Sequence, residues 1–223
     1  MNNKEEKGIR EEIRKEFQLD RMILFSDAVF AIVITLMAIE IRIPPIDGPV
    51  TREIVTHHLL HLVPTVIAYA ASFSFIGQIW YQHLQVFGLL KDYDKGLVIR
   101  NLLLLFLVGL FPFSITVITQ LNSSSFFLPA LIYFTILFLC KVAQLSLQYY
   151  ILVKKPNLRV HSGVHEELIR FKKSRLAVAM LLVLSILTSM SLYLIPDPQL
   201  KYMAWWWFFP FPFVLKYFQK RIK

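Results

Sequence analysis

The sequence predicts an all-α integral membrane protein with six transmembrane helices. Of the 223 residues, 56% are hydrophobic, and the charged residues (17%) gather between long apolar blocks. Soluble domains instead distribute charged residues over the faces of their helices and strands. Each apolar block has about the ~20 residues that a helix needs to cross ~30 Å of hydrocarbon. The six predicted spans are residues 21–43, 55–80, 97–121, 126–153, 174–195 and 199–218.

The first span follows a charged segment, residues 1–20, in which Ile9, Ile13 and Phe17 recur every four residues. This spacing places the three side chains on one helix face. It predicts a short cytoplasmic helix that leads into the membrane, although a frayed tail fits the segment equally well. Because many polar residues precede the first apolar block and no small-residue cleavage site follows it, the block is not a signal peptide.

The connections between the spans are mostly short and polar. A Pro/Gly loop occupies residues 44–54, "KDYDKG" at 91–96 forms a tight turn, and "NSSS" at 122–125 forms another. The longest internal loop is 154–173, and the run "GVHEELIRFKKSRL" within and after it predicts that the fifth helix starts before it enters the bilayer. With no internal repeat, residues 21–218 are predicted to be one six-helix domain, followed by a cytoplasmic tail at 219–223.

The positive charges predict the orientation of the chain. Twenty of the 24 Lys and Arg residues lie in the N-terminal segment, the second and fourth connections and the C-terminal end. The opposite side carries only Arg42, Arg52 and Lys201, and Lys141 lies inside a helix. Positive residues accumulate on the cytoplasmic side of membrane proteins. Both termini are therefore predicted to be cytoplasmic.

The same distribution argues against several other classes of protein. The net charge of +9 reflects membrane topology and anionic lipid rather than nucleic acid. The single cysteine, Cys140, precludes an intrachain disulfide. The sequence has no Gly-rich phosphate loop, no Cys/His metal cluster and no Ser-His-Asp arrangement on its loops, so we expect neither an enzyme nor a metal or organic cofactor.

Polar residues inside the predicted spans are the candidate functional residues, because charged groups in the bilayer rarely face lipid. Ser26 and Asp27 lie one turn inside the first span. Hydrogen-bonding partners at a matching depth are Arg21, Trp80, His83 and Asn101. We expect Ser26 and Asp27 to accept hydrogen bonds from these residues, in a network that joins the first three spans.

These residues also carry a resemblance to a known family. Arg21-x-x-x-Phe25-Ser26-Asp27 resembles the R-x-x-x-F-S-D signature of the transmembrane protein 175 family, the endolysosomal potassium channels and their prokaryotic relatives. The run "FSDAVFAIVITLMAIEI" is similar to the family's first helix, and Trp80, His83, Asn101 and the Pro112-Phe113 pair resemble its second and third helices. The likeness is detailed over residues 21–115, and the single six-helix unit is similar to the prokaryotic form.

The resemblance implies a homotetrameric cell-membrane channel that conducts K⁺ and other monovalent cations passively. In that family the first helix of each subunit lines the pore, and apolar side chains form the constriction in place of a filter of backbone carbonyls. By position relative to Ser26-Asp27, these side chains are Ile32, Leu36 and Ile39, with Thr35 beside them. Their spacing of i, i+4 and i+7 places the three apolar residues on one helix face.

Asp27 lies roughly 140° around the helix from Ile32, at ~100° per residue. We therefore expect Asp27 to fasten the first helix to its neighbours rather than to bind the permeating ion. The alternative function is a proton-coupled secondary transporter that uses Asp27 and His83. Carriers typically have broken helices or repeated halves, and the first span has neither Gly nor Pro before Pro44.

Three other groups of residues keep open alternatives. Glu40, near the outer end of the first span, either concentrates cations at the pore mouth or pairs with Arg42 or Arg52. His57, His58 and His61 are expected to be interfacial histidines, although His57 and His61 have the spacing of a metal pair. Lys141, with Gln144 and Gln148 on the same face, predicts an interhelical contact or a snorkelling lysine.

Overall fold

The computed structural model describes residues 3–42, 51–120, 128–160, 163–194 and 211–220. The chain divides into two compact units, Met1–Val160 and His161–Lys223. Throughout the described residues the secondary structure is helical, apart from one isolated β-bridge between Leu90 and Arg159. The all-α fold predicted from the apolar blocks is therefore confirmed.

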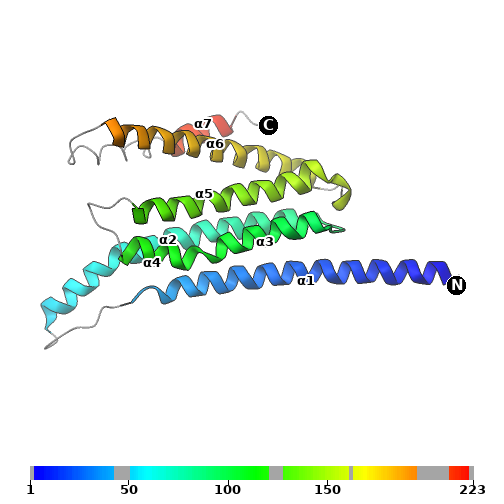
Figure 1. Cartoon of the computed structure of the whole chain (residues 1–223), viewed down its shortest axis with the longest axis horizontal. Coiled ribbons are helices and arrows are strands. Elements are labelled where there is room, and N and C mark those ends of the chain that lie inside the picture. Colours follow the sequence, from blue (N-terminus) through cyan, green and yellow to red (C-terminus); the bar gives the residue numbers. More distant parts are fainter. Residues whose placement is uncertain (1–2, 43–50, 121–127, 161–162, 195–210, 221–223) are drawn as a thin grey trace. The chain divides into compact units, whose positions relative to one another are not determined.

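The described part of the first unit contains five α-helices. They are α1 (Asn3–Ile39), α2 (Arg52–Phe87), α3 (Lys95–Gly109), α4 (Phe111–Gln120) and α5 (Leu128–Tyr149), followed by the π-helical turn η1 (Tyr150–Lys154) and the 3-10 turn η2 (Pro156–Leu158). In Figure 1, α4 continues from α3 end to end, and the two lie alongside α1, α2 and α5. Four segments of the described chain are long and apolar enough to cross a membrane, and they overlap the first four predicted spans: Glu6–Ile39, Arg52–Phe87, Lys95–Thr119 and Leu131–Lys154.

The second unit contains α6 (Val164–Leu194) and α7 (Phe211–Gln219). Helix α6 begins at Val164, well before the predicted fifth span, as the polar run ahead of that span predicts. Within this unit the Gln219 side-chain amide donates a hydrogen bond to the Lys173 carbonyl. Most of the predicted sixth span, residues 199–218, lies outside the described residues.

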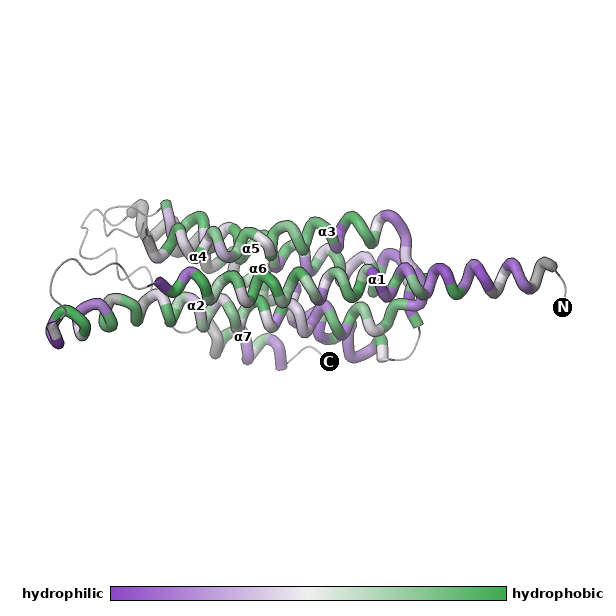
Figure 2. Tube along the Cα trace, turned by 90° about the horizontal axis from the view of Figure 1, so that it is seen from below, coloured by the Kyte–Doolittle hydropathy of each residue, from purple (hydrophilic) through white to green (hydrophobic). Residues whose placement is uncertain are grey.

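Helix α1 is longer than the sequence analysis predicts. It begins at Asn3 and runs without a break to Ile39, so the charged segment and the first apolar block form one helix. Figure 2 shows the change along it from hydrophilic at the N-terminus to hydrophobic, and both views show its first part projecting past the other helices of its unit. The predicted end at residue 43 is wrong, because the helix gives way to a turn at Glu40, just before the Pro44-Pro45 pair.

The predicted third span is two helices, α3 and α4, separated at Leu110. Proline at position 112 has no N–H to donate to the carbonyl four residues earlier, and its ring crowds that carbonyl. The Leu110 N–H instead bonds to the Leu107 carbonyl, and regular bonding resumes with the Ser114 N–H to the Leu110 carbonyl. The helix is therefore interrupted within the span.

Side-chain caps and an apolar core fix the remaining helices of the first unit. The Thr51 hydroxyl accepts from the Ile54 N–H at the start of α2, and the Asp94 carboxylate accepts from the Leu97 N–H at the start of α3. The core is formed by buried residues of α1 to α5, among them Phe30, Met37, Ile76, Leu104, Ile115 and Leu147. We call the end of this unit that carries Lys91, Lys95, Lys154 and Lys155 the basic end.

Candidate functional site

Asp27 is held by the indole of Trp80, which places the α1 carboxylate against α2. The Trp80 Nε1–H donates to Asp27 Oδ1 over 2.9 Å. Hydrogen bonds to a carboxylate are stronger than those between neutral groups. In an apolar environment such a bond joins two helices firmly, because neither group has water as an alternative partner.

Ser26 joins α1 to α3 at the same level. The Asn101 side-chain N–H donates to the Ser26 hydroxyl over 2.8 Å, and that hydroxyl donates to the Met22 carbonyl over 2.8 Å. On its other side, the Asn101 Oδ1 lies 2.9 Å from His83 Nε2 on α2. Ser26, His83 and Asn101 are all buried, and each of them has a partner.

We call Ser26, Asp27, Trp80, His83 and Asn101 the three-helix cluster. The His83 ring stacks on Phe87 with centroids 3.8 Å apart and contacts Phe30 on α1 at 5.6 Å. His83 bonds to Asn101 on α3, whereas the sequence predicts a bond from His83 to Ser26 or Asp27 on α1. The cluster ties α1 to both neighbours through distinct bonds.

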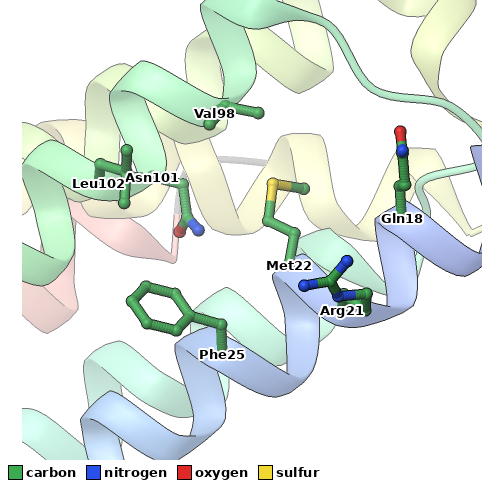
Figure 3. Close-up of a pocket in the computed structure, with 7 residues that line it drawn as sticks. All are labelled: Gln18, Arg21, Met22, Phe25, Val98, Asn101 and Leu102. Carbon is green, nitrogen blue, oxygen red and sulfur yellow. The ribbon is translucent and has the colours of Figure 1, made fainter.

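Arg21 and Phe25, the first two residues of the R-x-x-x-F-S-D pattern, lie apart from these bonds. Within the described residues, the Arg21 guanidinium has no hydrogen-bond or ion-pair partner, so the expected contact with Asp27 is absent. Both residues instead line a pocket of about 330 Å³ between α1 and α3 near the basic end (Figure 3). Its other lining residues are Gln18, Met22, Val98, Asn101 and Leu102.

The apolar residues expected to line a pore share one exposed face of α1. Ile32, Leu36 and Ile39 are 56%, 44% and 58% exposed. The opposite face of the same helix carries Phe30 and Met37, which are buried in the core. An apolar stripe left uncovered by the subunit itself must face lipid or another copy of the chain.

Thr35 lies next to this stripe and is exposed. Its hydroxyl donates to the backbone of the preceding turn, where the carbonyls of Ala31 and Ile32 lie 3.1 and 2.9 Å away. With its proton directed to the helix backbone, the Thr35 oxygen has lone pairs that can accept a bond from water or contact a cation.

Glu40 bonds to neither of the arginines considered for it. The Thr116 hydroxyl on α4 donates to Glu40 Oε2 over 2.7 Å, whereas the Arg42 Nε–H donates to the Ile39 carbonyl. The pairing of Glu40 with Arg42 or Arg52 is therefore wrong. Thr116 is six residues past the Leu110 break, and its place opposite Glu40 was not visible in the sequence.

The histidines at the start of α2 do not form a metal site with other described residues. No group of three His, Cys, Asp or Glu side chains there could hold a metal ion. The His58 Nδ1 lies 2.8 Å from the Ile54 carbonyl, and the His57 and His58 rings are in edge contact. The side chain of His61 is not among those that the structure describes.

Lys141 makes an interhelical contact, as one of the two alternatives for it predicts. Its Nζ donates to Gln78 Oε1 on α2 over 3.3 Å and lies 5.0 Å from the Phe75 ring centroid. Gln78, Gln82 and Gln85 were not among the predicted functional residues. The recurrence of glutamine at i, i+4 and i+7 in an apolar helix was the signal that could have found them.

Comparison with known proteins assigns the part of the chain that holds the three-helix cluster and the apolar stripe. Residues 21–112 match the family model described as endosomal/lysosomal potassium channel TMEM175. This part of the chain is therefore similar to the TMEM175 family. The match begins at Arg21 and ends at Pro112, so it covers the second half of α1, all of α2 and α3, and the start of α4.

The chain is also similar to bacterial proteins named as potassium channels. The chain is 38% identical over 100 residues to one from Streptomyces collinus, covering 45% of this chain and 47% of that protein. It is 35% identical over 109 residues to one from Chamaesiphon minutus, covering 49% and 53%. The chain thus matches about half the length of these curated relatives.

The likeness in fold extends further than the likeness in sequence. The crystal structure of a lysosomal potassium-selective channel TMEM175 homolog from Chamaesiphon minutus superposes with a TM-score of 0.64 and 25% identity. That alignment covers 92% of this chain and 98% of the other. The fold of the TMEM175 homolog is therefore shared well beyond residue 112.

Proposed function

We propose that the chain forms a homotetrameric, potassium-permeable channel in the cell membrane, with α1 of each copy lining a central pore. The observation that carries this proposal is the exposed stripe of Ile32, Leu36 and Ile39, on a helix whose other face is buried. The match of residues 21–112 to the TMEM175 family model and the potassium-channel names of the similar proteins support K⁺ as the permeating ion.

In this arrangement four copies of the stripe surround the axis and form an apolar constriction. A constriction of this kind passes ions when it is wide enough to hold water and closes by losing its water when it is narrower. A small rotation of α1 would therefore switch conduction. The exposed Thr35 oxygen, one residue from Leu36, would offer the ion or its hydration water a polar contact.

The three-helix cluster would set the rotation of α1 rather than bind the ion. Asp27 is engaged by Trp80 on α2, and Ser26 by Asn101 on α3, on a side of α1 away from the stripe. A proton-coupled carrier would instead need Asp27 or His83 to exchange protons with water. His83 is buried and stacked on Phe87, a geometry that favours a structural role.

The orientation that we propose has the basic end and both termini in the cytoplasm. Lys91, Lys95, Lys154 and Lys155 gather at the end past which the N-terminal part of α1 projects (Figures 1 and 2). Positive residues flanking spans are retained on the cytoplasmic side. Ile39 and Glu40 would then lie at the outer mouth of the pore.

The decisive experiment is K⁺ flux from liposomes reconstituted with purified protein, with and without a protonophore. Flux that depends on the protonophore indicates an electrogenic K⁺ leak, because uncompensated K⁺ efflux builds an opposing voltage. Ile32→Asn should raise the K⁺ flux several-fold, since it replaces an apolar barrier with a side chain that binds water.

The matched control is Ile67→Asn, the same substitution at an exposed position of α2. It should leave the flux of correctly assembled protein unchanged. A K⁺ flux that requires a proton gradient would favour the carrier. Equal changes in flux for Ile32→Asn and Ile67→Asn would show that α1 does not line the conduction path. The tetramer is checked separately by the mass of the purified protein in detergent.

A further inference from the structure

A second set of polar side chains lies on α2 and α5, outside the proposed pore, and Lys141 on α5 bonds to Gln78 on α2. Gln78, Gln82 and Gln85 on α2 are spaced i, i+4 and i+7, and Lys141, Gln144 and Gln148 on α5 are spaced i, i+3 and i+7. Each set therefore occupies one face of its helix. We call these six residues the α2–α5 seam.

Two contacts fix how the helices align. The Ser72 and Tyr133 hydroxyls lie 2.9 Å apart, and Lys141 reaches Gln78 over 3.3 Å. Because the residue numbers increase together on both helices, α2 and α5 run in the same direction. At equal rise per residue, Gln82 is then level with Gln144, and Gln85 with Gln148.

Several polar atoms of the seam lack a hydrogen-bond partner within the described residues. Gln144 and Gln148 are only 1% and 3% exposed. Within the described residues, Gln82 Oε1, Gln148 Oε1 and both polar side-chain atoms of Gln144 are buried without a hydrogen bond. Leaving such groups dry inside a membrane protein is costly, since nothing there replaces the hydrogen bonds of water.

Lys141 adds a buried positive charge to this set. Beyond its bond to Gln78 and its approach to the Phe75 ring, no carboxylate of the described chain pairs with it. Unpaired buried ammonium groups are rarer still than unpaired amides. A ligand of the seam must therefore accept a hydrogen bond from the Lys141 ammonium group and must also bond to the amide donors and acceptors of the glutamines.

We propose that the α2–α5 seam binds a file of ordered water molecules inside each subunit. Water satisfies the unpaired carbonyl oxygens by donating hydrogen bonds to them, and it satisfies the ammonium and amide N–H groups by accepting hydrogen bonds from them. A bound cation would be repelled by Lys141, and a bound anion would leave the carbonyl oxygens of Gln82, Gln144 and Gln148 unpaired. The file is thus separate from a cation pore.

The seam begins at Gln85 and Gln148, near the basic end. In the other direction it stops at the mutually bonded Ser72 and Tyr133, next to the buried apolar side chains of Ile76 and Ile136. Toward the basic end the polar positions continue to Gln85 and Gln148. Immediately beyond Gln148, α5 changes into the wider π-helical turn η1.

Cysteine accessibility in proteoliposomes tests this inference. In a Cys140→Ala background, Gln144→Cys and Gln148→Cys are exposed to a small, water-soluble methanethiosulfonate reagent. The matched controls are Ala143→Cys and Leu147→Cys, buried neighbours on α5 at the same depth. We expect the two seam positions to react at least tenfold faster than the controls, with the reagent on the side of the basic end. Equal rates would overturn the proposal.

A second measurement uses the unmodified chain, in case a cysteine variant fails to fold. Solid-state NMR of the protein in bilayers can follow magnetisation transfer from water to glutamine side-chain amides. We expect rapid transfer to the amides of Gln144 and Gln148, as for groups that touch bound water. If transfer to them is as slow as to the amides of buried Leu147 and Ile151, the seam is dry and the proposal is wrong.

Discussion

The three-helix cluster and the α2–α5 seam both bury polar side chains between helices, but they differ in how these groups are satisfied. In the cluster, Ser26, His83 and Asn101 each have a side-chain partner on another helix. In the seam, Gln144 has none among the described residues. A fully paired set of polar groups fixes helix positions, whereas an unpaired set needs water to be tolerated.

The contrast assigns the two regions different tasks. The cluster bonds α1, the helix with the exposed apolar stripe, to α2 and α3, and it lies within the part of the chain that matches the TMEM175 family model. The seam involves α5, which lies beyond the matched residues. Substitutions in the cluster and in the seam should therefore have independent effects. Those in the cluster should change how firmly α1 is held, and those in the seam should change its hydration.

Asn101→Leu should have the largest effect, because it removes two buried hydrogen bonds at once. Ser26 keeps only its bond to the Met22 carbonyl, and His83 Nε2 is left buried without a partner. We expect the free energy of unfolding to fall by about 2 kcal/mol. Thermal unfolding in detergent, followed by intrinsic fluorescence, measures this change.

Gln144→Leu is the matched substitution in the seam. It removes a side chain that has no protein partner among the described residues, so stability should change by less than about 0.5 kcal/mol. Equal losses of stability for Asn101→Leu and Gln144→Leu would show that the two regions do not differ in how their polar groups contribute to stability.

Asp27→Ala should have the next largest effect. It leaves the Trp80 indole N–H without its acceptor, and we expect a loss of about 1 kcal/mol together with a lower yield of assembled protein. The K⁺/Na⁺ preference of the protein that does assemble should be unchanged. Size-exclusion chromatography and ion-replacement flux assays read the two properties. Normal assembly with an altered ion preference would show that Asp27 acts on the ion.

Tyr133→Phe tests the closed end of the seam. The Ser72 hydroxyl still donates to the Ala68 carbonyl, so we expect a loss of only about 0.5 kcal/mol. If the Ser72–Tyr133 pair is what ends the seam, a cysteine at position 144 should become reactive from both sides of the membrane in this variant. Reactivity confined to the basic end would place the barrier in the apolar residues instead.

The smallest effect is expected at Asp94, at the basic end and outside both regions. Burial alone would raise the pKa of this carboxyl, but the Tyr150 hydroxyl, the Leu97 N–H and the charges of Lys155 and Arg100 together lower it below the ordinary value of 3.8. A lowered pKa in the folded state stabilises the protein above the unfolded-state pKa, and the contribution disappears as the pH falls through the folded-state pKa.

Asp94→Asn should therefore slightly lower the unfolding temperature at neutral pH and flatten its decline between about pH 5 and pH 2. Unfolding temperatures of the wild type and the variant across this range give the comparison. Parallel curves for the two proteins would mean that the Asp94 carboxylate adds no pH-dependent stability.

Some features of the protein follow from the sequence alone. Long apolar blocks predict helices, because a chain in hydrocarbon must satisfy its own backbone. The Arg21-to-Asp27 pattern resembles the TMEM175 signature, and the spacing of Ile32, Leu36 and Ile39 places them on one face whatever surrounds the helix. These inferences depend only on local geometry and composition.

Other features were decided by the tertiary structure. The partner of Glu40 is Thr116, the partner of Lys141 is Gln78, and Arg21 lies at a pocket rather than beside Asp27. Each of these depends on the rotation of one helix against another and on their relative heights. Side-chain packing over whole interfaces sets both the rotation and the height of a helix. A contact between residues 76 positions apart, such as Glu40 and Thr116, therefore cannot be predicted from a local sequence pattern.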